Sequence, residues 1–468
     1  MGAKADPELA SVRQVGAALA ERRLSSLEYA TELLSRHRAT KALNAFYHLD
    51  EDQLLRDARK SDERRSVGRT GRLEGIPVAI KDNISVANAP NTAGTPALRS
   101  HRPRTNAPIA QALVDAGALL MGKTAMDELA FGSTCNNAAF GATHNPLDPE
   151  RIPGGSSGGS GAVVAAGVAP LSLGTDTGGS VRVPAALCGI FGFRPTVGRY
   201  STKGIVPISR TRDTAGPLAG SVADLALIDS VICGGEDTLE AIDPATIRLG
   251  VPWAYFRSVL DAGVQTAFET AMARLRRANV TLVEADVPRV EELNTAAGFS
   301  ITLHETPVEI SRYLDSQGIG LSFKELVDSV ATPNVKRILT GLTGERRVPD
   351  AQYQRALKTD RAALQASFAG YLENNRLDAI AIPTVPLPAA RIAEGDEVKM
   401  GGVSYPTFEI FIRNTSPGSV AGTPGITMPI GRTGEGLAVG LGLEGGQNAD
   451  RRLLAVAAAL EPVIAERS

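Results

Sequence analysis

Residues 154–180 of this chain read GGSSGGSGAVVAAGVAPLSLGTDTGGS. Two glycine-serine clusters, residues 154–161 and 174–180, enclose two apolar segments, residues 162–166 and 171–173. A flexible linker would be rich in glycine and serine throughout, whereas these apolar segments have the composition of a protein core. Small side chains let backbone amides approach a ligand, and serine hydroxyls can attack a carbonyl or relay a proton. The segment is therefore predicted to carry a site of chemistry.

Short apolar runs on both sides of this segment are typical of buried β-strands. One such run is residues 76–80, and a helix near residues 108–116 and a strand near residues 118–121 follow it. Because strand-like runs alternate with helical stretches along the chain, the pattern predicts α/β layering. The further strand-like runs are residues 171–173, 248–251, 280–283, 379–382 and 426–428.

Two helical regions accompany the predicted sheet. The N-terminal region, residues 1–65, includes a capping box of Ser25 and Glu28, which predicts a helix that begins after Ser25. The other region, residues 288–372, is predicted to pack on the sheet domain as a cap or as a wall of the substrate pocket. A length of 468 residues gives a prior of about three domains. No internal repeat or long linker divides the chain, so we predict a single domain over residues 1–468.

Composition and charge argue against two classes of partner. The chain has 49 Lys and Arg residues against 51 Asp and Glu, and a formal net charge of −2. Nucleic-acid binding needs a basic excess or a basic stripe, and the longest weakly polar run, residues 162–174, is shorter than the ~18 apolar residues of a membrane span. We therefore expect neither nucleic acid nor a membrane as a partner. Of the 48 glycines, 13 lie in residues 154–204, around the predicted site.

The cysteines indicate a reducing environment. Cys135, Cys188 and Cys233 are odd in number and lack CxxC spacing, which argues against a disulfide framework and against a structural zinc site. The first 25 residues contain charged side chains and no apolar run of signal-peptide length. A cytoplasmic protein without a metal or another cofactor is expected.

Two sequence patterns typical of nucleotide binding occur in unsuitable contexts. Residues 117–124 match the phosphate-binding pattern G-x4-G-K-[ST], but the four variable positions themselves resemble a buried strand and would leave few amides free for a phosphate. Residues 440–445 match the dinucleotide pattern G-x-G-x-x-G, but too few residues follow for the rest of a βαβ unit. Both segments are predicted to be strands next to turns.

A third pattern offers an alternative nucleophile. Residues 155–159, GSSGG, match the G-x-S-x-G elbow of α/β-hydrolases, with Ser157 in the position of the nucleophile. Such an esterase needs a histidine later in the chain, and His304 is the only one that follows the elbow. This alternative requires that His304→Ala abolish activity.

Segments outside the two clusters complete a longer pattern. Residues 75–83 read GIPVAIKDN, residues 184–196 contain PAA and GFRPT, and PTVP and GTP occur at residues 383–386 and 422–424. In their order and spacing, these segments and the two clusters resemble the amidase signature family of serine hydrolases over nearly the whole chain. The resemblance implies a large single α/β domain with a central mixed β-sheet flanked by helices.

The resemblance also implies a catalytic set without histidine. Ser180 corresponds to the nucleophile, Ser156 to a bridging serine held by a cis peptide bond, and Lys81 to the base. An ordinary lysine has a pKa near 10.4 and is protonated at neutral pH. Burial and hydrogen bonds that favour the neutral amine would lower this pKa, so that Lys81 could accept a proton from Ser180 through Ser156.

Further residues of the second cluster are expected to support the nucleophile. The backbone amides of residues 177–180 would hold the tetrahedral oxyanion, because residues without bulk allow a close approach. Asp176 and Arg182 flank this turn and are expected to orient it or to pair with each other, and Ser157 is expected to be a hydroxyl of the loop. The four residues of the expected oxyanion hole are Thr177, Gly178, Gly179 and Ser180.

Two segments resemble one branch of the family, the indoleacetamide and mandelamide hydrolases. They are residues 192–202, GFRPTVGRYST, and residues 412–415, IRNT. The implied function is hydrolysis of the C–N bond of small, aryl-bearing amides through an acyl-enzyme, with carbamates (urethanes) and esters as further substrates. A glutamine-hydrolysing amidotransferase subunit remains an alternative, although such subunits tend to have an acidic residue near the position of Ile412.

The substrate pocket is expected to draw on three regions. These are residues 130–136, with Ala130 as a lining residue, residues 300–345 and residues 405–420. A small amide or carbamate and water are the expected partners in the reaction, and the enzyme is expected to be a monomer or a homodimer.

Overall fold

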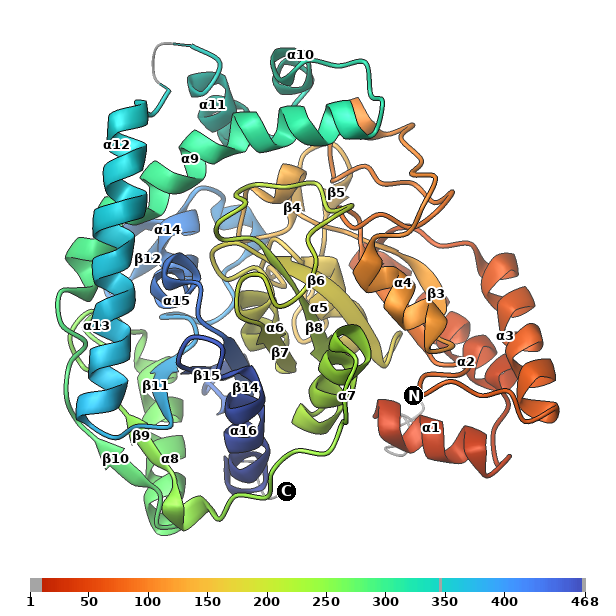
Figure 1. The fold of residues 1–468 in the computed structure, drawn as a ribbon, viewed down its shortest axis with the longest axis horizontal. Coiled ribbons are helices and arrows are strands. Elements are labelled where there is room, and N and C mark those ends of the chain that lie inside the picture. The colour runs from red at the N-terminus through yellow and green to blue at the C-terminus, as the bar shows by residue number, and fades with distance from the viewer. Residues whose placement is uncertain (1–10, 345–346, 465–468) are drawn as a thin grey trace.

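The computed structural model describes residues 11–344 and 347–464. Within these residues, eleven strands form one mixed β-sheet flanked by helices, in the order β1-β3-β2-β6-β8-β7-β14-β15-β11-β9-β10 (Figure 1). The predicted fold class, a large α/β domain with a central mixed sheet, is confirmed. The strands of this sheet are β1 Phe46–His48, β2 Pro77–Lys81, β3 Leu119–Thr124, β6 Leu171–Asp176, β7 Phe191–Arg194, β8 Thr214–Ala219, β9 Arg248–Gly250, β10 Thr281–Val283, β11 Ala379–Pro383, β14 Gly425–Arg432 and β15 Ala438–Glu444.

The predicted capping box is present at the start of α2. The Ser25 side chain accepts a hydrogen bond from the Glu28 amide, and the Glu28 carboxylate accepts one from the Ser25 amide. The first part of the predicted N-terminal helical region, residues 1–10, lies outside the described residues. The α-helices are α1 Val12–Ala20, α2 Ser26–Ala39, α3 Glu51–Ser66, α4 Pro108–Asp115, α5 Gly158–Ala165, α6 Arg182–Cys188, α7 Val222–Cys233, α8 Ala262–Arg277, α9 Val290–Ser316, α10 Phe323–Asp328, α11 Pro333–Gly341, α12 Asp350–Arg355, α13 Arg361–Asn374, α14 Thr407–Ile412, α15 Ser416–Ala421 and α16 Asp450–Ile464.

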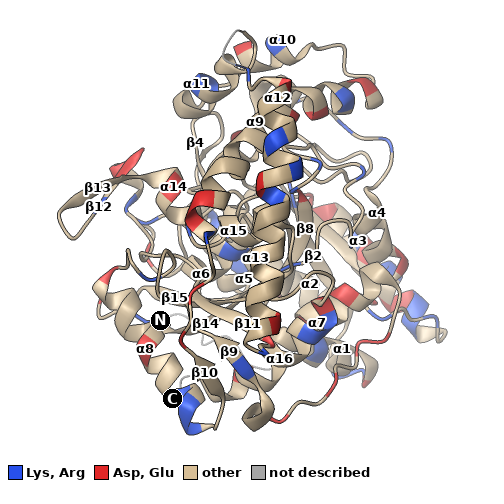
Figure 2. Ribbon diagram, turned by 60° about the vertical axis from the view of Figure 1, so that its left-hand side comes forward, with Lys and Arg blue, Asp and Glu red and all other residues tan. Residues whose placement is uncertain are grey.

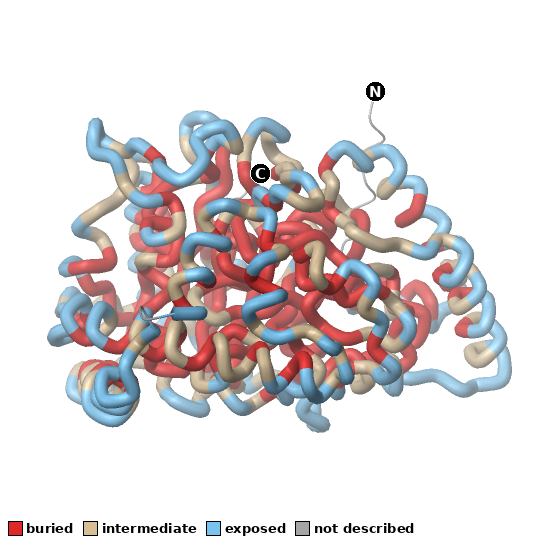
Figure 3. Tube along the Cα trace, turned by 90° about the horizontal axis from the view of Figure 1, so that it is seen from above, coloured by how far each residue is buried: buried red, intermediate tan, exposed pale blue. Residues whose placement is uncertain are grey.

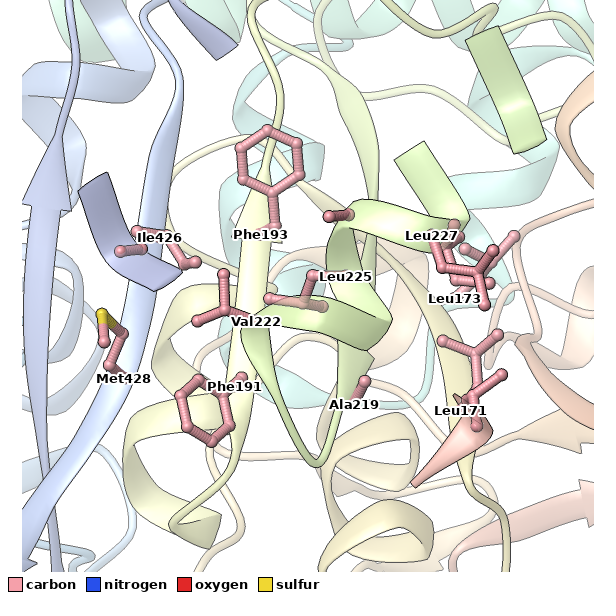
Figure 4. Packing of buried hydrophobic residues seen from close by; sticks show 14 of the residues in the cluster. Leu171, Leu173, Phe191, Phe193, Ala219, Val222, Leu225, Leu227, Ile426 and Met428 are labelled. Carbon is pink, nitrogen blue, oxygen red and sulfur yellow. The ribbon is translucent and has the colours of Figure 1, made fainter. Parts of the chain in front are cut away.

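The two faces of the sheet carry side chains of different size. Successive residues of a strand point to opposite faces. On one face, large apolar side chains such as Phe193 on β7 and Ile426 on β14 pack with Leu225 of α7 (Figure 4). On the other face, α6 lies so close to Gly192 and Gly440 that an added Cβ at either position would come 2.7 Å from an alanine Cβ of this helix. Glycine at these positions therefore allows α6 to pack directly on the sheet.

Strand order brings the two halves of the predicted site together. Lys81 is the last residue of β2, and the second glycine-serine cluster runs from β6 into the turn that follows it. β2 and β6 are parallel neighbours, with Ile80 opposite Leu173, so their carboxyl ends meet at the same edge of the sheet. This edge is where α/β folds commonly place their sites.

A group of helices stands beyond this edge. Helices α9 to α13 follow one another between residues 290 and 374; Figure 1 shows α9 across the top of the molecule and α12 and α13 along its left side. Buried residues fill the centre of the molecule and exposed residues its periphery (Figure 3). In the view of Figure 2, acidic and basic residues are interspersed along the outer helices. Among the helices described, none combines the length and apolar character that a membrane crossing requires.

Candidate active site

A cavity of about 680 Å³ opens above the second glycine-serine cluster. Thr177, Gly178 and Ser180 contribute to its lining, and α9 and α14 supply much of its walls. Most of the walls are apolar, which suits an aryl group. The apolar and aromatic lining residues include Phe131, Ile208, Phe299, Leu303, Ile338, Phe408 and Ile412.

Lys81 lies fully buried at the end of β2, next to this turn. Its Nζ donates hydrogen bonds of 2.8 Å to the Ser156 and Thr175 hydroxyls. Asn83 Nδ2 also donates to the Thr175 hydroxyl, at 3.1 Å, which fixes the Thr175 side chain. No carboxylate of the described residues lies within ion-pair distance, 4.0 Å, of the Lys81 amine. In this part of the chain, hydroxyl groups are thus the only hydrogen-bond partners of the amine.

This environment favours the neutral form of the amine. Burial lowers the pKa of Lys81 to about 7, because an ammonium loses its hydration in the protein interior, and the more distant charge of Asp127 opposes this shift. A large fraction of Lys81 is therefore able to accept a proton near neutral pH.

The peptide bond between Gly155 and Ser156 is cis, as the resemblance implied. The Ser156 carbonyl accepts a hydrogen bond of 3.2 Å from the Asp127 amide. A Cβ at Gly155 would come 2.0 Å from Asp127 Oδ2, so a larger residue would clash with this carboxylate. The Asp127 carboxylate is held in turn by the Cys135 amide at 2.9 Å. The Ser156 hydroxyl is thereby positioned beside Lys81.

The turn after β6 presents Ser180 to the cavity. Gly179 has a φ of +143°, and a Cβ there would come 2.2 Å from the Thr415 hydroxyl, so only glycine fits. Within the described residues, the amides of residues 177–180 donate no hydrogen bond, and neither does the Ser180 hydroxyl. Ser180 is only 8% exposed. The turn therefore offers unoccupied donors and a hydroxyl at the cavity surface.

Charged residues behind the turn form a buried network. Asp176 accepts hydrogen bonds from Arg182 Nε at 3.1 Å and from Arg194 Nη1 at 2.9 Å. Burial alone would raise the pKa of Asp176, but these two guanidinium groups outweigh it and hold that pKa well below its ordinary value. Arg182 Nη1 also donates to Glu444 Oε1 at 2.5 Å, which ties the turn to β15. Asp176 and Arg182 thus pair with each other and support the turn.

The structure separates Ser157 from His304. The Ser157 hydroxyl is buried and donates to the Thr175 carbonyl at 3.1 Å. His304 lies on α9, where its Nδ1 is 3.0 Å from the Val348 carbonyl and its ring stacks on Tyr353. Because each side chain has partners elsewhere, the structure does not support the alternative in which His304 activates Ser157. Within the described residues, no group of three His, Cys, Asp or Glu side chains could hold a metal ion.

The cavity includes residues that the sequence pointed to and others that it did not. Ala130 lines it, and so do residues of the 300–345 and 405–420 regions. Sequence reasoning missed Thr175, although this residue lies inside the second cluster, one position before Asp176. It also missed Arg212, which lies outside every glycine motif and reaches the cavity through contacts with α9.

Comparisons with known proteins agree with this geometry. The family model described as Amidase matches residues 28–454. An indoleacetamide hydrolase of Agrobacterium vitis is 43% identical, with 98% of each chain covered. A mandelamide hydrolase of Pseudomonas putida is 39% identical, with 97% of this chain and 91% of the relative covered. A crystal structure titled as that of an amidase has a TM-score of 0.86 and 32% identity, with 97% of this chain and 100% of that chain covered.

Three findings support one assignment. They are the family match over nearly the whole chain, the shared fold and the similarity to the indoleacetamide and mandelamide hydrolases. The chain belongs to the amidase family and is a hydrolase of C–N bonds other than peptide bonds.

Proposed function

We propose that this enzyme hydrolyses small, aryl-bearing amides through an acyl-enzyme on Ser180, with Ser156 as proton relay and Lys81 as base. The observation that carries the proposal is the environment of Lys81, whose buried amine has the Ser156 and Thr175 hydroxyls as its only hydrogen-bond partners among the described residues. A buried structural lysine normally has an anionic partner, whereas a base must be able to lose its proton.

The first step is acylation. The Ser180 hydroxyl attacks the amide carbonyl, its proton passes to Ser156, and the Ser156 proton passes to Lys81. The Ser180 hydroxyl makes no hydrogen bond within the part of the chain that the structure describes, so its contact with Ser156 would form when the substrate is bound, as is common for catalytic contacts. The same relay then returns a proton to the amine, which leaves. Water takes the place of the amine and attacks the acyl-enzyme, and the same steps run in reverse until Ser180 is free again.

The turn of residues 177–180 would stabilise the charge that develops on the carbonyl oxygen. Its amides have no partner among the described residues, and a preorganised donor of this kind contributes about 2.7 to 4 kcal/mol in other hydrolases. Asp176 and Arg182 would hold the turn in place from behind.

The cavity favours an apolar acyl group. Phe299 and Phe408 stand with ring centroids 6.3 Å apart at the cavity wall, and Ile412 lines the region next to Gly178. The names of the two relatives, which refer to indoleacetamide and mandelamide, agree with an aryl-bearing amide. Carbamates and esters present the same carbonyl to the same nucleophile, so we include them as further substrates. A cytoplasmic monomer or homodimer remains the expected form.

The decisive experiment compares Lys81→Ala, Ser156→Ala and Ser180→Ala with the wild type on aryl amides, anilides, carbamates and esters. We expect Ser180→Ala to lower kcat/KM by about 10⁴-fold or more. Ser160→Ala is the matched control, because Ser160 belongs to the same cluster as Ser156 but bonds to Thr124 and the Leu173 carbonyl.

Mass spectrometry identifies the nucleophile independently. A serine-reactive sulfonyl fluoride should add its mass to the peptide that contains Ser180 and leave Ser180→Ala unlabelled. Undiminished turnover by Ser180→Ala would overturn the proposal. Glutaminase activity that requires added partner proteins would instead favour the amidotransferase alternative.

A further inference from the structure

Arg212 is a buried cation in the wall of the substrate cavity. Its side chain is 4% exposed and contributes to the cavity lining. Nη1 donates to the Gly298 carbonyl at 2.9 Å and to the Thr302 hydroxyl at 2.7 Å, both on α9. These two bonds fix the guanidinium against the helix and leave its other nitrogens for another partner.

The rest of the guanidinium has no partner in the described part of the chain. Among residues 11–344 and 347–464, buried Nε has no hydrogen-bond partner, Nη2 has none either, and no carboxylate lies within 4.0 Å of the guanidinium. Arg182 and Arg194 are as deeply buried, yet both pair with Asp176. Because a buried charge is costly unless it is paired, the exception at Arg212 indicates that a ligand supplies the missing partner.

The free edge of Arg212 lies beside the turn that holds the nucleophile. Nη2 and Ile412 Cδ1 are both 3.7 Å from the point that a Cβ on Gly178 would occupy. A hydrogen-bond donor and an apolar contact therefore stand together next to the proposed oxyanion amides. Of the other charged lining residues, Glu291 and Arg413 lie 3.7 Å apart, and Arg413 also donates to the Tyr255 carbonyl. Arg337 and Glu409 are exposed, unlike the buried Arg212.

We propose that Arg212 determines specificity by binding an acceptor oxygen that the substrate carries on, or in place of, the carbon next to its scissile carbonyl. The site would then prefer 2-hydroxyamides and carbamates to amides that have only hydrogen-bearing carbon at that position. This inference rests on the proposed function, because the turn of residues 177–180 is what places the scissile carbonyl near Arg212. A substrate that lacks this oxygen leaves the buried guanidinium without an acceptor, and the enzyme therefore discriminates against it.

The test compares two pairs of substrates that differ in one oxygen. The first pair is mandelamide and phenylacetamide; the second is ethyl N-phenylcarbamate and N-phenylbutanamide, in which a CH₂ replaces the ester oxygen. The readout is the ratio of kcat/KM within each pair for the wild type and for Arg212→Met. We expect the wild type to favour the oxygen-bearing member and Arg212→Met to lower that preference by about 10- to 100-fold in at least one pair, as for a lost hydrogen bond to a charged group.

Arg210→Met is the matched control. Arg210 is two positions away and half exposed, lies outside the cavity lining, and approaches Glu305 at 3.6 Å, so its loss should leave both ratios as in the wild type. Arg212→Lys keeps the positive charge on a side chain of different length and should lower the ratio of kcat/KM within a pair to an intermediate value. This variant tests the proposal if Arg212→Met does not fold.

The outcomes separate the possible roles. An equal loss of kcat/KM on both members of each pair would mean that Arg212 acts on the oxyanion and would overturn the specificity role. Unchanged ratios in both Arg212 variants would also overturn it. Ser180→Ala is assayed alongside and tests the proposed function separately. The ratios compare two substrates of one enzyme, so they test the role of Arg212 whichever serine is the nucleophile.

Discussion

Two lysines, Lys81 and Lys123, end up side by side at the same edge of the sheet. Lys81 lies at the end of β2 and Lys123 in the neighbouring strand β3, opposite Ile80. Both are buried, and burial lowers the pKa of Lys81 to about 7 and that of Lys123 to about 8. The two lysines therefore have nearly the same position in the fold and nearly the same burial.

Their partners differ. Lys123 donates to the Ile84 and Pro90 carbonyls and to Asn91 Oδ1, and its Nζ lies 3.5 Å from the Asp82 carboxylate. Lys81 has two hydroxyl partners and no carboxylate within ion-pair distance among the described residues. Carbonyl and carboxylate oxygens can only accept, so they hold a protonated amine, whereas a hydroxyl can also donate to a neutral one. The comparison teaches that the chemistry of the hydrogen-bond partners, more than burial, distinguishes Lys81, the proposed base, from Lys123.

Of the changes that test this contrast, Lys81→Met has the largest expected effect on activity. We expect kcat/KM to fall by about 10³- to 10⁴-fold, because the relay loses its base, while the protein still melts cooperatively. Kinetics on an aryl amide and a thermal melt test both parts. Activity within tenfold of the wild type would contradict the role of Lys81 and the contrast with Lys123.

Lys123→Met should act on stability instead. It leaves the Asp82 carboxylate without its ion-pair partner and two backbone carbonyls without their donor. Removing one member of a buried pair costs about 3 to 5 kcal/mol. Chemical denaturation of Lys123→Met and Lys81→Met side by side measures the difference. If Lys123→Met were as stable as Lys81→Met, the structural role of Lys123 would be wrong.

The pH dependence of the wild type sharpens the contrast. A lysine with a pKa of about 7 is neutral above that pH and protonated below it. We expect kcat/KM to level off above about pH 7 and to fall about tenfold per pH unit below it, because only the neutral amine accepts a proton. The charge of Asp127 favours the protonated form of Lys81, so Asp127→Asn should move the acidic limb of the pH profile, where kcat/KM falls, to lower pH. A limb that stayed flat down to pH 5 would exclude Lys81 as the titrating base.

Thr175→Val has the smallest expected effect. It removes one of the two hydrogen-bond acceptors of Lys81, and an ordinary hydrogen bond contributes about 1 kcal/mol, so kcat/KM should fall by roughly tenfold or less. The limb of the pH profile should also move to lower pH, because the protonated amine loses an acceptor. A shift to higher pH would show that Thr175 donates to the neutral amine in the active enzyme.

Much of the sheet could be predicted from the sequence, but the central strands β7 and β8 could not. The predicted runs at residues 76–80 and 379–382 are strands because continuous apolar residues mark strands buried on both faces. In contrast, β8 contains Gly216 and Pro217, which normally disfavour a central strand. The structure tolerates Pro217 because β7 pairs only with the residues that follow it.

The sequence predicts the site residues that belong to local motifs, but not those whose position depends on contacts with distant parts of the chain. Lys81 and the two glycine clusters belong to sequence patterns, and parallel strands then bring them together. Arg212 gave no such signal, since its position depends on Gly298 and Thr302, about 90 residues further along the chain. The cavity walls on α9 share this property, because a helix that lines a pocket has the same periodicity as one that covers a core.

The bond between Arg182 and Glu444 has a consequence for biosynthesis. The two residues are 262 positions apart, yet the carboxylate on β15 helps to hold the turn that carries Ser180. Chains fold as they are synthesised, beginning with the N-terminal part, so the proposed nucleophile is made long before this support. A nascent chain that already contains the proposed catalytic residues Lys81, Ser156 and Ser180 would thus lack this support until β15 has joined the sheet.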